Sequence, residues 1–118
     1  MKYFPNGKEI KVHEGIETKC FEFGEENEYT ILSSVLKPGA IVEEHSHRDY
    51  QICIVTEGEL LINCDGKDFL LKANENALYI PKNVKHSAIN NSSKSIKSID
   101  IKKKKAPAAI KAVKKAVA

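Results

Sequence analysis

Residues 39–58 read GAIVEEHSHRDYQICIVTEG, and this stretch decides how the chain folds and what it can bind. Side chains alternate between the two faces of a β-strand, and positions 45, 47, 51, 53 and 55 share one parity. We therefore expect His45, His47 and Gln51 to project to the same face. Two imidazoles that are two positions apart on a strand start about 7 Å apart at the backbone. Both can thus reach a single ion.

A second stretch, residues 75–90 with the sequence ENALYIPKNVKHSAIN, supplies a third histidine. His86 follows a turn that is made rigid by Pro81. Three imidazoles and one oxygen donor form a set of ligands typical of a divalent transition metal. Zinc, nickel, manganese, iron and copper all accept such a set, so the sequence predicts one metal ion without its identity.

Outside these stretches, the first 93 residues consist of short alternating segments separated by turn signals. Pro38-Gly39 suits a type II turn, and Asp65-Gly66 suits a two-residue hairpin. Short strands at intervals of roughly 8–12 residues predict an all-β sandwich or barrel. The expected strands are 18–23, 29–36, 41–47, 50–56, 59–63, 67–71, 77–80, 86–90 and 95–101.

The charge of the chain is divided between its body and its C-terminal end. Residues 1–93 hold 10 basic and 15 acidic side chains, a net charge of −5, whereas residues 94–118 hold nine lysines and Asp100, a net charge of +8. Arg48 is the only arginine, which argues against a surface built for bidentate contacts with phosphate or guanine. We therefore expect no nucleic-acid site on the body and consider a nucleic-acid partner unlikely.

The 118 residues are enough for one domain. We predict a β-domain over 1–101 and a lysine- and alanine-rich tail or short helix over 102–118. In the tail, Ile110, Val113 and Val117 recur at helical spacing after Pro107. Three interpretations of the tail are open: a solvated or packing segment, an electrostatic tether to nucleic acid or an anionic membrane, and a contribution to the active site.

Three features predict a cytoplasmic location. The three cysteines are widely spaced and odd in number, which favours free thiols in a reducing compartment. The N-terminus has no apolar signal core, and no stretch approaches the roughly 18 apolar residues of a membrane helix. We accordingly expect no membrane partner.

The two histidine-bearing stretches resemble the two motifs of the cupin superfamily. Residues 39–58 match G-x5-H-x-H-x3-E-x6-G at every spacing, and residues 75–90 are similar to G-x5-P-x-G-x2-H-x3-N. The resemblance implies a double-stranded β-helix, or jelly-roll barrel, with a metal in its mouth. It also implies a homodimer that often exchanges N-terminal strands. His45, His47 and His86 match the family's metal histidines, and Gln51 stands at the place of its carboxylate ligand.

The departures from the motifs carry information. Glu75 and Asn83 replace two glycines, and asparagine tolerates the positive φ that glycine would supply. Gln51 replaces glutamate, so a bound ion keeps its full formal charge of +2. Such a site should favour anionic ligands and act as a stronger Lewis acid.

The set of three histidines and one glutamine resembles that of small cupins that convert unsaturated uronic acids to linear keto acids. The chain shares with them an aspartate on the last strand, Asp100, between Ile99 and Ile101. It departs from them afterwards, because Lys102 to Lys105 stand where those enzymes have an aromatic residue and then an arginine. The specific substrate is therefore left open.

Two carboxylates are candidate catalytic residues. Asp100 has the parity opposite to its isoleucine neighbours and is a candidate general acid or base if it faces the barrel interior. Glu43 shares parity with His45, so it either lines the same pocket or lies in solvent near the start of the strand. The remaining polar and aromatic candidates are expected to have packing or structural roles: His13, Tyr50, Cys53 and Tyr79.

These observations predict a small metal-dependent cupin enzyme that acts on a polar, anionic metabolite such as a sugar acid or keto acid. Isomerase, lyase or tautomerase chemistry follows most directly from the charge arrangement. An iron- or nickel-dependent dioxygenase is the alternative enzyme. A ligand-binding or regulatory cupin without turnover is the alternative of another class, since one fold hosts many functions.

Overall fold

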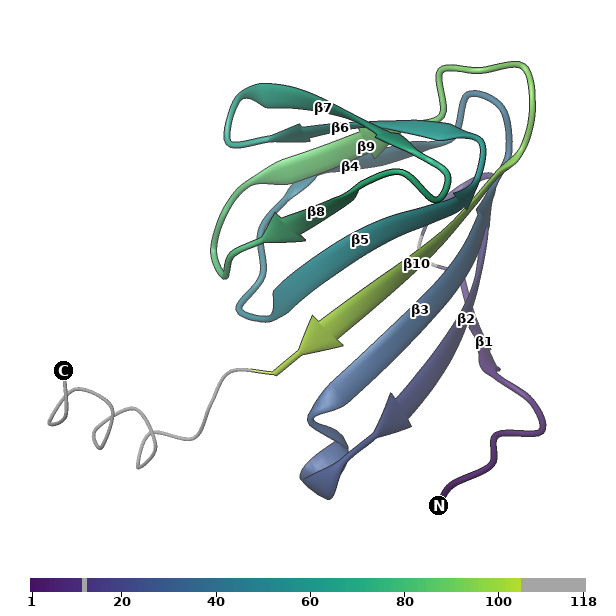
Figure 1. Ribbon diagram of the computed structural model, residues 1–118, viewed down its shortest axis with the longest axis vertical. Helices are drawn as coiled ribbons and strands as arrows, with labels where there is room; N and C mark the ends of the chain where they lie inside the picture. Colours follow the sequence, from purple (N-terminus) through teal and green to yellow (C-terminus); the bar gives the residue numbers. More distant parts are fainter. Residues whose placement is uncertain (12, 105–118) are drawn as a thin grey trace, which may run out of the picture.

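The computed structural model describes residues 1–11 and 13–104, which form two antiparallel β-sheets packed face to face (Figure 1). The helical structure in these residues is a single 3₁₀ turn, η1 (Glu25–Asn27). The strands are β1 (Lys8–Ile10), β2 (Ile16–Phe23), β3 (Tyr29–Leu36), β4 (Ile41–His45), β5 (Tyr50–Glu57), β6 (Glu59–Cys64), β7 (Lys67–Lys72), β8 (Ala77–Ile80), β9 (His86–Ile89) and β10 (Ile96–Lys103). The larger sheet has the order β1-β2-β3-β10-β5-β8, and the smaller has the order β4-β9-β6-β7. The predicted all-β jelly-roll barrel is confirmed.

All nine predicted strands are present, and their ends differ from the prediction by at most two residues. The structure adds β1, a three-residue edge strand that pairs with β2 and is too short to show a period in the sequence. Strand β10 continues to Lys103, so the expected domain boundary after residue 101 falls inside a strand. The helix expected near the C-terminus lies outside the described residues.

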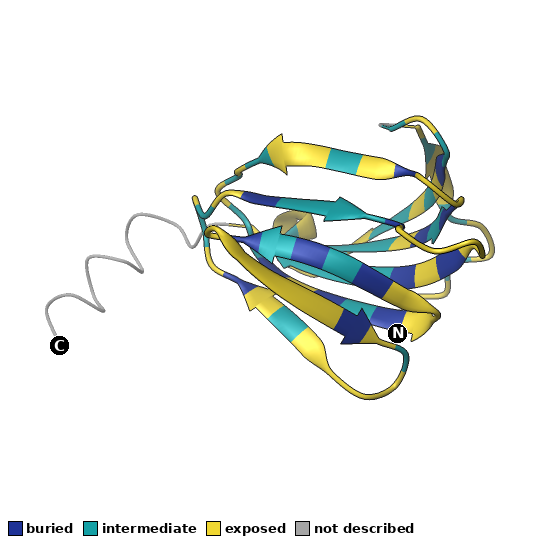
Figure 2. Cartoon of the chain, turned by 90° about the horizontal axis from the view of Figure 1, so that it is seen from above, coloured by how far each residue is buried: buried dark blue, intermediate teal, exposed yellow. Residues whose placement is uncertain are grey.

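The hydrophobic core lies between the two sheets, and buried residues alternate with more exposed ones along strands such as β5 and β6 (Figure 2). Val55, Ile80 and Ile96 from the larger sheet are almost completely buried, and Leu60 and Ile62 from the smaller sheet pack in the same cluster. Each such side chain stabilises the fold by about 1.5–3 kcal/mol. This core forms the apolar floor beneath the histidines.

Turn residues place the strands as the sequence predicts. Gly39 has φ +80°, and the Ala40 amide donates to the Lys37 carbonyl at 3.0 Å, which closes the turn before β4. Asp65 and Gly66 both have positive φ, as a type I′ hairpin requires. Asn83 adopts φ +62° in the turn before His86, so the asparagine does replace the family's glycine there.

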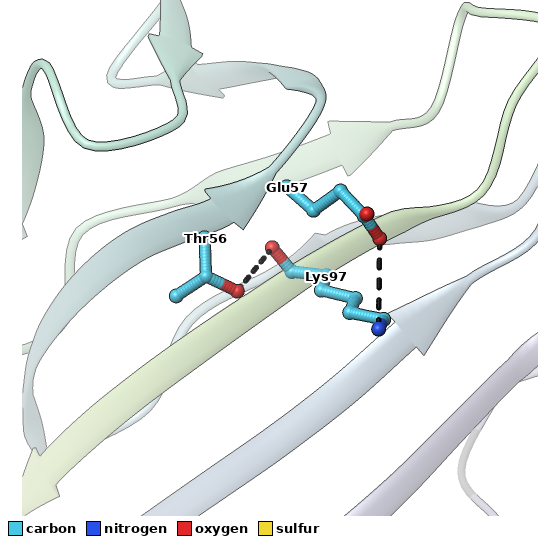
Figure 3. A network of polar contacts seen from close by, with 3 residues as sticks. All are labelled: Thr56, Glu57 and Lys97. Carbon is cyan, nitrogen blue, oxygen red and sulfur yellow. Dashed lines mark hydrogen bonds and ion pairs between the residues drawn. The ribbon is translucent and has the colours of Figure 1, made fainter.

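A register shift sets the alignment of β5 with β10. Glu57 lies opposite Lys97 and Val55 lies opposite Ser98, so Thr56 is left without a partner. In Figure 3 the Thr56 hydroxyl donates to the Lys97 carbonyl at 3.3 Å, and the Lys97 ammonium lies 3.6 Å from the Glu57 carboxylate. Both charged side chains are more than half exposed, so their attraction is worth little. The shift matters because it places Asp100 opposite Cys53.

Candidate metal centre

Three histidines from separate segments converge at one end of the barrel. His45 ends β4, His47 follows in the connection to β5, and His86 begins β9. Their ligand atoms all lie within 4.8 Å of one another, and the ring centroids are 4.3 to 5.6 Å apart. His45 pairs with His86 across the sheet, and the Asn83 amide donates to the His47 carbonyl at 2.7 Å. Strand pairing and a backbone hydrogen bond thus join the two histidine-bearing stretches, 39–58 and 75–90, at the site.

A β-bulge in β4 turns the first histidine inward. The register against β9 shifts between Val42 and His45. Val42 packs against the core and His45, three residues later, joins the cluster, so the faces do not simply alternate across this segment. Glu43 is consequently exposed at the rim of the cavity, and its backbone carbonyl contacts the His45 ring.

Each ring of the cluster is oriented by a backbone carbonyl. The Nδ1 atoms of His45, His47 and His86 lie 2.8, 3.1 and 2.8 Å from the carbonyl oxygens of residues 43, 49 and 84. A carbonyl can only accept, so Nδ1 of each ring must donate its proton. In a neutral ring the lone pair then lies on Nε2. Proteins orient metal-binding histidines in this way, with a carbonyl that accepts a hydrogen bond from the ring nitrogen that does not face the metal.

His86 provides a direct test of whether a metal fits. Its Nε2 is the only buried side-chain nitrogen or oxygen without a hydrogen-bond partner in residues 1–11 and 13–104. Burial lowers the pKa of His86, and the neighbouring histidines and Lys102 act in the same direction against the raising effect of the Val84 carbonyl. A neutral ring with an unpartnered lone pair is what a divalent transition metal needs. The donor set therefore fits a metal ion.

Gln51 presents an oxygen to the same cluster. Its Nε2 donates to Asp100 Oδ1 at 2.8 Å, which fixes the amide, and its Oε1 lies 2.8 Å from His47 Nε2. If the His47 ring is neutral, two acceptors face each other at hydrogen-bond distance. A cation bound by both atoms, or a second proton on the ring, makes this contact favourable. The geometry thus points the Gln51 oxygen to where a cation would sit.

Asp100 faces the barrel interior, because β10 directs its even-numbered residues inward. Its carboxylate accepts from Gln51, and Asp100 lies opposite the buried Cys53 on the neighbouring strand. Burial, together with the Asp100 charge, raises the pKa of the Cys53 thiol, which therefore stays protonated. Asp100 is thus held beside the Gln51 amide, and the oxygen of that amide contacts His47.

The cluster opens into a cavity of about 510 Å³, within the usual range of small-molecule sites. Its floor is apolar and its mouth is polar. His13 and Lys102 also line it, although sequence analysis gave His13 a structural role and did not assign Lys102. Lys102 shares the inward parity of Asp100 on β10, so the alternation of side chains along this strand could have predicted its place in the cavity. No sequence pattern places His13, which reaches the cavity from the loop before β2.

Two further features lie away from the cluster. Tyr50 and Tyr79 stack with their ring centroids 6.5 Å apart and do not line the cavity, and Tyr79 is 53% exposed. A larger hollow of about 1310 Å³ runs along β1, β2 and the loop before β4. It is lined by none of the three clustered histidines.

Comparisons with known proteins agree with this geometry. The H2HPP isomerase of Bacillus subtilis is 34% identical over 104 residues, which is 88% of this chain and 43% of that protein. The structure of AerE from Microcystis aeruginosa superposes with a TM-score of 0.80 and 28% identity over 88% of this chain and 48% of that one. The chain therefore spans less than half the length of these two relatives. KdgF from Halomonas sp. matches with a TM-score of 0.69 and 19% identity over 83% and 87% of the two chains, which supports the fold.

The family assignment rests on the stretch that holds every residue of the cluster. The model of the cupin domain family matches residues 33–102, more than half of the chain. This range includes both histidine-bearing segments and ends within β10. The protein belongs to the cupin family.

Proposed function

We propose that this protein is a metal-dependent enzyme, with one divalent ion held by four side chains: His45, His47, Gln51 and His86. The observation that carries the proposal is the convergence of three oriented histidines on a point where His86 Nε2 is buried without a partner. An orphaned buried nitrogen costs about 1–3 kcal/mol, and metal binding removes this cost.

The charge of the site supports an anionic, polar metabolite as substrate, such as a sugar acid or keto acid. Gln51 is neutral, so the protein ligands would not offset the ion's charge. A bound divalent ion supplies Lewis acidity, which polarises a carbonyl and favours an enolate. The cavity, of about 510 Å³, has room for a small metabolite.

Asp100 is the group best placed to move a proton. Its carboxylate lies against the Gln51 amide, so a substrate near the histidines lies close to it. An isomerisation or tautomerisation needs a base that takes a proton from one atom and returns it to another. Glu43, exposed at the rim, is the second candidate. The relative from Bacillus subtilis is an isomerase by name, which favours this chemistry over a dioxygenase.

The first experiment is elemental analysis of the purified wild type and of a His45→Ala/His86→Ala variant. We expect about one transition metal per chain in the wild type and its loss in the variant. His13→Ala is the matched control, because His13 lines the cavity outside the cluster. A wild type that stays empty after reconstitution with each candidate metal would contradict the proposal.

Turnover is tested next on a panel of unsaturated uronates and keto acids, with oxygen uptake followed in parallel. Product formation without oxygen uptake supports an isomerase, lyase or tautomerase. Oxygen consumption would support the dioxygenase instead. Binding without turnover across the panel would indicate a ligand-binding or regulatory cupin.

We further propose a cytoplasmic homodimer. Cys20, Cys53 and Cys64 are all free thiols, which suits a reducing compartment. None of the described segments forms a helix long and apolar enough to cross a membrane. The outer face of the larger sheet carries rows of apolar side chains that a second copy would cover.

A further inference from the structure

We propose that Lys102 is the substrate-anchoring residue of the cavity, binding a carboxylate of the metabolite that reaches the histidine cluster. This inference rests on the proposed function and names the group that selects its substrate. Such a residue would make the cavity bind small keto or hydroxy acids in preference to their neutral analogues.

The strand register places Lys102 beside the cluster. It lies on β10 between Gln51 of β5 and Thr30 of β3, and pairs with both. Paired residues on neighbouring strands have Cβ atoms about 4.5–5.5 Å apart. Lys102 shares the inward parity of Asp100 and lines the cavity together with Gln51. Its flexible four-carbon stem can bring the ammonium to a ligand held near Gln51.

Lys102 has no ion-pair partner in the described chain. The ion pairs found there are Lys11 with Glu14 and Lys97 with Glu57. The nearest inward carboxylate on its own strand, Asp100, already accepts a hydrogen bond from the Gln51 amide. Lys102 is a partly buried residue with no described ion pair to break, so its ammonium can donate charge-assisted hydrogen bonds to an anion.

Lys102 lies on the inward face of β10 and lines the same cavity as His86. The next residue shows the contrast. Lys103 faces outward, with its ammonium 5.6 Å from the centroid of the Tyr29 ring. Two adjacent lysines on one strand thus have the same charge and opposite surroundings.

This contrast supplies a matched pair of variants. We would load full-length protein with nickel and measure binding of pyruvate and of the neutral pyruvamide by titration calorimetry. In Lys102→Gln we expect the preference for pyruvate over pyruvamide to fall about tenfold, the size of a lost charge-assisted hydrogen bond. Lys103→Gln removes the same charge from the outer face and should leave the preference unchanged. Lys102→Arg keeps a cation in the cavity and should retain most of the preference.

The outcomes separate the two proposals. Equal preferences in Lys102→Gln and Lys103→Gln, in a wild type that holds nickel and prefers pyruvate, would overturn the role of Lys102 and leave the metal site standing. A wild type that holds nickel and binds neither compound would contradict the anionic substrate class, and the anchoring role with it. Nickel content and far-ultraviolet circular dichroism of every variant show that the fold is intact, so a changed preference reports on the cavity.

Discussion

At the scale of single residues, the side-chain amide of Gln51 faces two neighbours, of which one requires a hydrogen-bond donor and the other an acceptor. Asp100 needs a donor, which Nε2 supplies, and a cation near His47 needs an acceptor, which Oε1 supplies. Glutamate can give the second and not the first. The glutamine therefore allows a carboxylate on β10 and a cation site to coexist on adjacent strands.

Replacing Gln51 by glutamate should reverse this balance. Two carboxylates would then face each other. We therefore expect the free energy of unfolding of metal-free Gln51→Glu to be about 1–3 kcal/mol lower than that of wild type at pH 7. Added divalent metal should restore most of the loss, because the new charge is then paired. Thermal melts with and without chelator measure both effects. Asp100→Asn in the same background removes the repulsion and should recover stability without metal; a Gln51→Glu protein as stable as wild type in chelator would contradict the argument.

The lowered pKa of His86 predicts a pH dependence with a definite sign. In the window between its folded value and the unfolded value of about 6.5, the unfolded chain binds more protons than the folded one. Stability of the metal-free protein should therefore be fully present above about pH 6.5 and fall as the pH drops through the folded value. Metal affinity should fall over the same range, since a proton competes for Nε2.

Denaturant unfolding of metal-free protein between pH 5 and 8 checks this dependence. His86→Gln should flatten the profile below about pH 6.5. His13→Gln is the control and should keep the wild-type slope. A His86→Gln profile parallel to that of wild type would assign the acid sensitivity to other groups.

At the scale of elements, Asn90 joins three strands just after β9. Its side chain is completely buried and its amide donates to the carbonyls of Leu36 and Lys94 at 2.9 and 2.8 Å. Its Oδ1 accepts from the Ser92 amide at 3.0 Å. The motif asparagine thus closes the ends of β3, β9 and β10 and touches none of the histidines.

Asn90→Ala should therefore destabilise the fold and spare the metal site. The loss removes the hydrogen bond to the buried Leu36 carbonyl, together with the part-buried bonds to the Lys94 carbonyl and from the Ser92 amide. We therefore expect the free energy of unfolding to drop by about 2–4 kcal/mol. Asn91→Ala, at the exposed neighbouring position, should change it by less than about 0.5 kcal/mol. Urea unfolding measures both. Loss of metal from folded Asn90→Ala would show that the asparagine also supports the site.

Local sequence patterns predict the strands and most of the inward positions, and they fail where pairing between distant segments decides the structure. Alternation and turn residues predicted every strand except β1, and parity correctly placed Gln51 and Asp100 on inward faces. Parity failed in β4, because the bulge that brings both Val42 and His45 inward depends on pairing with β9, forty residues away. A bulge arises from such long-range pairing, which a local period does not contain.

At the scale of the whole molecule, both sheets show apolar side chains to solvent. The smaller sheet has a row of one residue from each strand, Ile41, Ile89, Leu61 and Leu70, and the larger sheet has a longer one. The outward side chains of the larger sheet form an apolar row across five neighbouring strands, one residue from each: Tyr79, Ile52, Ile101, Ile31 and Phe21. Ile54 and Ile99 pair in the next row. The proposed homodimer would cover this apolar face, because a two-fold interface places the same patch on both sides.

A charge in the middle of this row should dissociate the proposed dimer. Ile52 is 40% exposed on the larger sheet, and Leu70 is 43% exposed on β7 of the smaller sheet. By sedimentation velocity at micromolar concentration, we expect the wild type at twice the 13.2 kDa of one chain and Ile52→Lys at one chain. Leu70→Lys introduces the same charge at an equally exposed leucine and should remain a dimer. Metal content should stay unchanged in both variants, because the outer row lies on the opposite face of the sheet from the cavity. A monomeric wild type would refute the interface, and an Ile52→Lys protein that stays dimeric would move it to another face.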